Sequence, residues 1–196
     1  DVVEDILRIY GYNNVEIPTQ LKGCLVVKGA EDKKHKMANL VSEQLVGCGF
    51  NEIMNNSLTR GAYYEGHNAY PTENSVNIMN PLSNDLNVMR QSLLFGGLES
   101  IEYNVKRQNG NLRFFEFGNV YKFDPERKNA DNPMAAYKED FHLALWLTGK
   151  RVENSWAHAN EDSSYHELDA YVKNILSRIG AQPGMLVRKK SANDIF

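Results

Sequence analysis

The sequence predicts an α+β fold in which a mostly antiparallel β-sheet is flanked by helices. Two segments, 33–47 and 163–180, have apolar residues at helical spacing and end at or near glycines, which is typical of amphipathic helices packed on a core. Two others, 113–123 and 140–149, are rich in aromatic and branched residues, as strands are. Strands joined in part by short turns, with helices packed on them, favour an α+β fold.

The first element, residues 1–10, is predicted to be a helix that ends at Gly11. Its apolar side chains share one broad face: Val2, Val3, Ile6, Leu7, Ile9 and Tyr10. Asp1, Glu4 and Asp5 lie on the other face and are neighbours, because helix residues three and four apart face each other. Such acids can complement the helix dipole, or they can provide oxygen ligands for a hard cation such as Mg²⁺. The spacing alone fits both interpretations.

The next part of the chain is predicted to contain one helix and two strands. Pro18 lies in a linker that leads to the helix at 33–47. The apolar stripe of this helix consists of Met37, Leu40, Val41, Leu45 and Cys48. Residues 50–59 alternate as in a strand, 61–74 form a polar loop with a helical turn, and 75–82 form a short strand.

A long helix is predicted from about Asn84 to Arg107, with an apolar stripe of Leu94, Leu98, Ile101 and Val105. Gly96 and Gly97 lie in its interior, where each glycine costs about 1 kcal/mol relative to alanine. We therefore expect the glycine pair to mark a close approach by a neighbouring helix.

The remaining elements are two strands and a helix. The strand at 113–123 follows a turn. The strand at 140–149 is apolar on both sides, which is typical of a central strand with both faces covered. The last helix, 163–180, is expected to have Ser163 or Ser164 as its N-cap.

Composition narrows the function classes. The net charge of −3 and the scattered lysines and arginines argue against a main nucleic-acid grip in this chain. Cys24 and Cys48 lack metal-ligand spacing, so reduced thiols of a cytosolic protein are expected. The absence of a signal peptide and of a long apolar span predicts a soluble protein. No phosphate-loop, dinucleotide-binding, hydrolase or metalloprotease motif is present, and the chain looks like a piece of a longer polypeptide.

One long stretch carries a family resemblance. Residues 80–124 read NPLSNDLNVMRQSLLFGGLESIEYNVKRQNGNLRFFEFGNVYKFD. They resemble the phenylalanyl-tRNA synthetase β-subunit family of bacteria, which has Asn-Pro-Leu-Ser, Leu-Arg-x-Ser-Leu-Leu, Asn-x-x-Arg and Phe-Glu-x-Gly-x-Val-Phe/Tyr in this order. The resemblance implies a class II aminoacyl-tRNA synthetase-like fold, an antiparallel sheet flanked by helices. It also implies that residues 1–18 end a small helical domain and that 19–196 form a catalytic-like domain truncated at its C-terminal end.

The same resemblance implies a chain without its own active site. Catalytic class II domains carry Phe-Arg-x-Glu after the long helix, and that arginine grips the α-phosphate of ATP with two donors. The comparable place here is Tyr121-Lys122-Phe123-Asp124, and Lys122 is a point charge without a fork. No catalytic or cofactor-binding residue is therefore expected. The alternative is a catalytically active class II-type adenylating domain, against which Lys122 speaks.

The implied complex is phenylalanine–tRNA ligase, a cytoplasmic (αβ)₂ heterotetramer that uses ATP to join phenylalanine to tRNA-Phe, with no membrane association. The chemistry would belong to the α subunit, with this segment as its structural partner. In the family an Asp-x-x-Glu-Glu pattern of the β subunit shares a Mg²⁺ with α. Asp1, Glu4 and Asp5 match this pattern, with Asp5 in place of Glu, so the resemblance favours the metal interpretation.

Overall fold

A computed structural model of the chain describes residues 1–20, 23, 29–129 and 131–181. The chain divides into two compact units, residues 1–34 and residues 35–196, which are described separately. The predicted domain boundary between residues 18 and 19 stays a prediction. Cys24 and residues 21 and 22 of the predicted linker lie outside the described residues, and Cys48 is a free thiol.

The first unit begins with the predicted helix, α1 (Val2–Tyr10), which ends at Gly11 with a φ of 91°. A 3-10 turn, η1 (Tyr12–Asn14), follows. No residue of α1 is buried, and Ile9 is 91% exposed. The apolar face predicted from the sequence is thus present and open along the helix.

The second unit is built on a sheet with the strand order β1-β5-β6. The long strands β5 (Arg113–Phe123) and β6 (Tyr137–Leu147) pair antiparallel over their full length, and β1 (Asn51–Glu52) pairs parallel with β5. The predicted central position of β6 is wrong, because among the described strands β5 lies in the middle. Residues of β6 do contact apolar side chains on both faces, but covered faces do not make a strand central.

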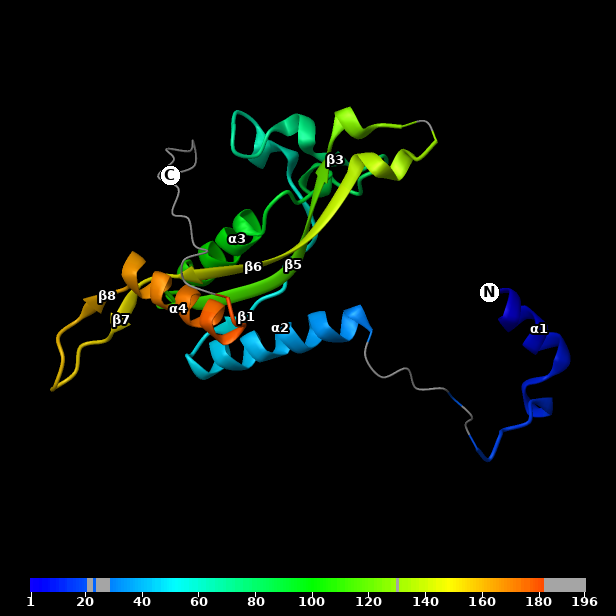
Figure 1. The fold of residues 1–196 in the computed structure, drawn as a ribbon, viewed down its shortest axis with the longest axis horizontal. Coiled ribbons are helices and arrows are strands. Elements are labelled where there is room, and N and C mark those ends of the chain that lie inside the picture. Colours follow the sequence, from blue (N-terminus) through cyan, green and yellow to red (C-terminus); the bar gives the residue numbers. More distant parts are fainter. Residues whose placement is uncertain (21–22, 24–28, 130, 182–196) are drawn as a thin grey trace. The chain divides into compact units, whose positions relative to one another are not determined.

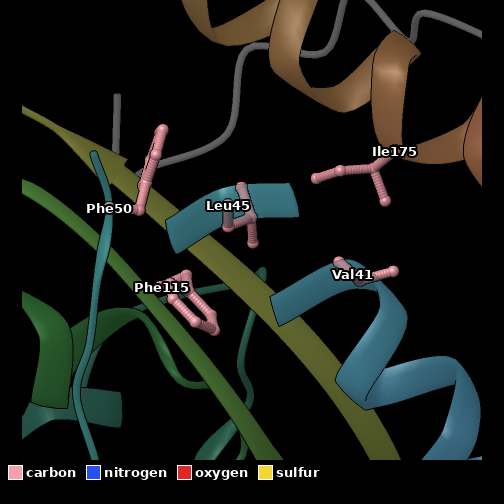
Figure 2. Packing of buried hydrophobic residues seen from close by; sticks show 5 residues of the cluster. All are labelled: Val41, Leu45, Phe50, Phe115 and Ile175. Carbon is pink, nitrogen blue, oxygen red and sulfur yellow. The ribbon is translucent and has the colours of Figure 1, made fainter. Parts of the chain in front are cut away.

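Two helices cover one face of this sheet: α2 (Ala30–Gly47) and α4 (Tyr165–Arg178) (Figure 1). The buried cluster between them and the sheet comprises Val41, Leu45, Phe50, Phe115 and Ile175 (Figure 2). The N-cap of α4 is Ser164, whose side chain accepts a hydrogen bond from the backbone N–H of Glu167. Both helices lie within the predicted segments to within a few residues.

The third helix, α3 (Leu94–Val105), covers the opposite face (Figure 1). The cluster on this side comprises Leu93, Leu112, Phe114, Val120 and Trp146. Because strand side chains alternate between faces, the even-numbered residues of β5 point toward α3 and the odd-numbered residues toward α2 and α4.

The helix predicted from Asn84 is wrong in its first ten residues. That segment contains a 3-10 turn, η4 (Asn84–Leu86), and a strand, β4 (Val88–Met89). Strand β4 lies between β2 (Leu58–Thr59) and β3 (Val76–Asn77) in a second antiparallel sheet, so these residues bond to other strands. The hydroxyl of Ser92 accepts from the N–H of Leu94 where α3 begins.

Two further segments differ from or refine the predictions. The predicted strand at 50–59 is split, because β1 and β2 belong to different sheets. The polar loop at 61–74 contains the 3-10 turns η2 (Gly61–Tyr64) and η3 (Thr72–Asn74), as expected. A third, small sheet joins β7 (Lys150–Val152) to β8 (Glu161–Asp162). None of the helices in the described residues is long and apolar enough to cross a membrane.

Candidate functional site: the sheet face beneath α3

A buried ion pair lies on the face of β5 that points toward α3. Nη1 of Arg90 and Oε1 of Glu116 are 2.6 Å apart, and the two side chains are 8% and 1% exposed. Glu116 comes from the middle of β5, and Arg90 directly follows β4. A charge buried this deeply is tolerated only when it is paired and its remaining hydrogen-bonding groups are satisfied.

The polar groups around this pair are well satisfied. Asn55 donates to both oxygens of Glu116, from its backbone N–H at 3.2 Å and from its side chain at 2.7 Å. Arg90 donates through Nε to the carbonyl of Asn119 at 2.9 Å and through Nη1 to the carbonyl of Asn55 at 3.3 Å. Ser100 of α3 donates to Oδ1 of Asn55 at 2.8 Å. The network therefore ties β5, the segment after β1, and α3 together.

Gly118 has no side chain, and the guanidinium of Arg90 occupies the space that this leaves on the sheet. A Cβ atom built at Gly118 would lie 2.2 Å from Nη2 of Arg90 and 3.0 Å from Cδ2 of Leu93. Non-bonded contacts of a Cβ below 3.0 Å are essentially never found, so a side chain at this position would displace Arg90 and press against Leu93. The Phe-Glu-x-Gly pattern noted in the sequence thus supplies the acid that pairs with Arg90 and the space that Arg90 occupies.

The glycine pair of α3, Gly96 and Gly97, lets the helix lie in close contact with two neighbouring residues. A Cβ at Gly97 would lie 2.1 Å from ring atoms of Trp146 in β6, and a Cβ at Gly96 would lie 3.0 Å from Cβ of Asn55. The predicted close contact is confirmed. The expectation that a helix makes it is wrong, because the neighbours are a strand residue and a loop residue. Gly97 lets α3 lie directly on the ring of Trp146.

Together these contacts cover the surface above β5. Arg90, Leu93 and α3 lie over the face from Phe114 to Val120. The space that remains beside Arg90 is a small cavity of about 90 Å³. Sequence reasoning missed the Arg90–Glu116 pair. The available signal was that Glu116 is in phase with Phe114 and Val120, which marks it as facing the core.

Lys122 lies beyond this covered region. It is exposed, and its register partner across the strands is Lys138. Lys138 is 2.8 Å from Asp140, and this hydrogen bond, with the charges of His142 and Lys122, lowers the pKa of Asp140. Of the two lysines that face each other here, Lys138 is therefore already paired with a carboxylate.

A cavity of about 470 Å³ lies near the same end of the hairpin. It is lined by Val76, Met89, Tyr121, Met134, Tyr137, Lys138 and Glu139. Among the described residues its walls carry one lysine and one glutamate, and a carboxylate beside the lysine repels phosphate groups. This cavity is poorly suited to a nucleotide triphosphate, which requires several cationic or backbone donors.

The acids predicted to hold a metal ion lie at the start of α1. Asp1 is the N-cap residue, Glu4 and Asp5 are in the first turn, and all three are exposed. Oε1 of Glu4 is 2.6 Å from Nη2 of Arg8. In the part of the chain that the structure describes, no group of three His, Cys, Asp or Glu side chains is placed to hold a metal ion. The three carboxylates by themselves do not form a complete Mg²⁺ site. Their role as metal ligands stays a prediction.

The arrangement on the sheet can be compared with known families. Residues 17–196 match the family described as the phenylalanyl tRNA synthetase beta chain CLM domain. The chain belongs to this family. The β-chain family resemblance stated from the motifs between Asn80 and Asp124 is thereby confirmed.

Relatives of this β-chain family cover the entire chain. Phenylalanine–tRNA ligase beta subunits from Bacteroides fragilis and Porphyromonas gingivalis are 62% and 48% identical over 196 residues. The subunit from Fusobacterium nucleatum is 28% identical over 193 residues, 98% of this chain. The chain spans about a quarter of the length of these relatives (24%, 24% and 23%).

Two solved structures share the fold. An ATP phosphoribosyltransferase regulatory subunit/histidyl-tRNA synthetase from Bacillus halodurans gives a TM-score of 0.54 at 15% identity, covering 86% of this chain and 40% of that one. A pyrrolysyl tRNA synthetase from Desulfitobacterium hafniense gives 0.51 at 14% identity, covering 76% and 46%. The predicted class II synthetase-like α+β fold is confirmed.

Proposed function

We propose that this β-chain segment is a non-catalytic scaffold of phenylalanine–tRNA ligase and the structural partner of the catalytic α subunit. The observation that carries this proposal is the filled sheet face. Arg90 is neutralised by Glu116 at 2.6 Å, and α3 lies against Trp146 through Gly97. At the position of the phosphate-binding arginine the sequence has Lys122, which lacks a guanidinium fork.

The complete enzyme would join phenylalanine to tRNA-Phe with ATP, as a cytoplasmic (αβ)₂ heterotetramer. The names of the relatives, all beta subunits of phenylalanine–tRNA ligase, support an α partner. The net charge of −3 supports placing the main tRNA contacts elsewhere in the complex. In this arrangement the segment supplies shape and contact surface, and the α subunit supplies the adenylation chemistry.

The acids of α1 would contribute to a Mg²⁺ shared with the α subunit. Mg²⁺ prefers octahedral oxygen ligands and usually keeps several waters, so a site can be divided between two chains. Asp1, Glu4 and Asp5 are exposed and thus accessible to a partner. Glu4 would have to exchange its contact with Arg8 for the metal, and that contact is an exposed pair of small energetic weight.

Exchange of pyrophosphate into ATP, dependent on phenylalanine, tests the scaffold proposal. We expect no exchange from the full-length β chain alone and full exchange from the α–β complex. In the complex, Lys122→Ala should leave the rate within about twofold of wild type, because the lysine touches no substrate in this proposal. Lys138→Ala, at the register partner, is the matched control.

The active-domain alternative makes the opposite forecast. Exchange by the β chain alone, abolished by Lys122→Ala and retained in Lys138→Ala, would show that this sheet adenylates and would refute the scaffold proposal.

A further inference from the structure

The β7–β8 hairpin carries a fully exposed tryptophan at its far end. Trp156 is 101% exposed, whereas Trp146 in β6 is 8% exposed. The segment between β7 and β8 projects away from the β5–β6 sheet (Figure 1). Tryptophan is highly buried on average, and it is enriched among the few residues that carry most of the binding energy in protein interfaces. An isolated tryptophan in water at the end of a hairpin therefore indicates a contact surface.

The backbone around Trp156 is held in a turn. The N–H of Ser155 donates to the carbonyl of His158 at 2.9 Å. The hydroxyl of Ser155 accepts from the N–H groups of Ala157 at 3.3 Å and His158 at 3.2 Å. These three bonds close a loop around Trp156, which reduces the ordering cost that a partner must overcome.

The base of the hairpin is fixed to the rest of the unit. Asn111 accepts from the N–H of Lys150 at 2.9 Å and donates to Glu153 at 2.7 Å. The N–H of Ser163 donates to the carbonyl of Gly149 at 2.9 Å. The tip is therefore presented at a set position relative to the sheet.

Charge indicates the kind of partner. Residues 153–160 contain no lysine or arginine, and their titratable side chains are Glu153 and His158. Arg151, in β7, is already paired with Glu161 at 3.1 Å. Nucleic acids and anionic membranes are bound mainly through clusters of lysine and arginine, and the tip offers a single histidine in their place. The small neighbours of the ring, Ser155 and Ala157, instead allow it to enter an apolar pocket of a protein.

We propose that Trp156 is an anchor that inserts into an apolar pocket on the α subunit. This inference rests on the proposed scaffold function, which makes the α subunit the protein that the segment must hold. An aromatic side chain on a closed turn, with a fixed base and with small uncharged residues on both sides, fits such a contact.

Binding measurements with full-length chains test the anchor. We expect Trp156→Ala to weaken the α–β complex at least about tenfold, as truncation of an aromatic anchor does. Trp156→Phe should weaken it less, because the smaller ring keeps part of the contact. Asn154→Ala, a matched change two residues away, should leave the dissociation constant unchanged.

Hydroxyl-radical footprinting read by mass spectrometry provides a second, residue-specific measurement. Trp156 should be oxidised readily in free full-length β and protected several-fold in the complex. Met79, which is 92% exposed, serves as the internal reference.

The outcomes separate this inference from the proposed function. A wild-type β chain that does not bind α would refute the scaffold proposal itself. Normal assembly by Trp156→Ala, or protection of Trp156 already in the free β chain, would overturn only the anchor. Loss of tRNA binding by Trp156→Ala with α binding intact would assign the tip to RNA, and would equally overturn it.

Discussion

Replacement of Arg90 by methionine should destabilise the domain strongly, because it leaves Glu116 buried without its counter-charge. Removing one partner of a buried ion pair costs about 3–5 kcal/mol. In this protein Glu116 would keep two hydrogen bonds from Asn55, at 3.2 and 2.7 Å, so we expect the lower end of that range, about 3 kcal/mol. That loss is a large fraction of the 5–15 kcal/mol typical of a domain's stability.

Urea unfolding followed by circular dichroism measures this loss. Arg127→Met is the matched control, because Arg127 pairs with Asp124 at the surface and is 70% exposed. The control should change the free energy of unfolding by less than about 0.5 kcal/mol.

The double variant Arg90→Met/Glu116→Leu separates pairing from packing. Removing both charges leaves no unpaired ion, so the double variant should be more stable than Arg90→Met alone, with a coupling energy of about 1 kcal/mol or more. If the two single changes add without coupling and each costs less than about 1 kcal/mol, Arg90 and Glu116 do not depend on each other. The ion pair would then not stabilise the face of β5 beneath α3.

Two further predictions concern the helices. Gly97→Ala should lower the free energy of unfolding by about 1–3 kcal/mol, because its Cβ would lie 2.1 Å from Trp146; Gly47→Ala, where nothing lies within 4 Å, is the control. An unchanged urea midpoint for Gly97→Ala would mean that α3 shifts freely. In the full-length β chain, Glu4→Gln should weaken assembly with α in the presence of Mg²⁺ and have little effect with a chelator, because metal binding and assembly are linked. Equal losses in both conditions, measured as dissociation constants, would instead assign Glu4 to the helix dipole.

The sequence was most informative where a pattern is local. The strand at 113–123 coincides with β5, and Ser164 caps α4 within the predicted helix, because alternation and capping depend on neighbouring residues. The predicted start of α3 is wrong because a local pattern cannot show long-range pairing. The segment containing β4 is compatible with a helix on its own, but it forms a strand because β2 and β3, which are distant in sequence, bond to it.

The candidate site was harder to predict because it depends on long-range contacts. Arg90 and Glu116 are 26 positions apart, and neither residue indicates its partner. Gly97 correctly predicted a close approach, but Trp146 could not be identified as the neighbour without the register of β5 and β6. The structure shows where the acids of α1 lie. It does not test whether they bind Mg²⁺, because the other ligands of the proposed site belong to the α subunit.

The filled sheet face also explains why a single change should not convert this scaffold into an adenylating domain. A guanidinium at position 122 would lie opposite Lys138 and near Asp140, where the neighbouring carboxylate repels a phosphate. Arg90, which lies on this face, is neutralised by Glu116 at 2.6 Å, and its guanidinium occupies the space left by Gly118. Freeing Arg90 would leave Glu116 unpaired in the core at a cost of about 3 kcal/mol or more. Under the proposed scaffold function, the residues that keep α3 on the sheet are therefore the same ones that keep Arg90 paired, so the stability of the domain opposes a change to adenylation.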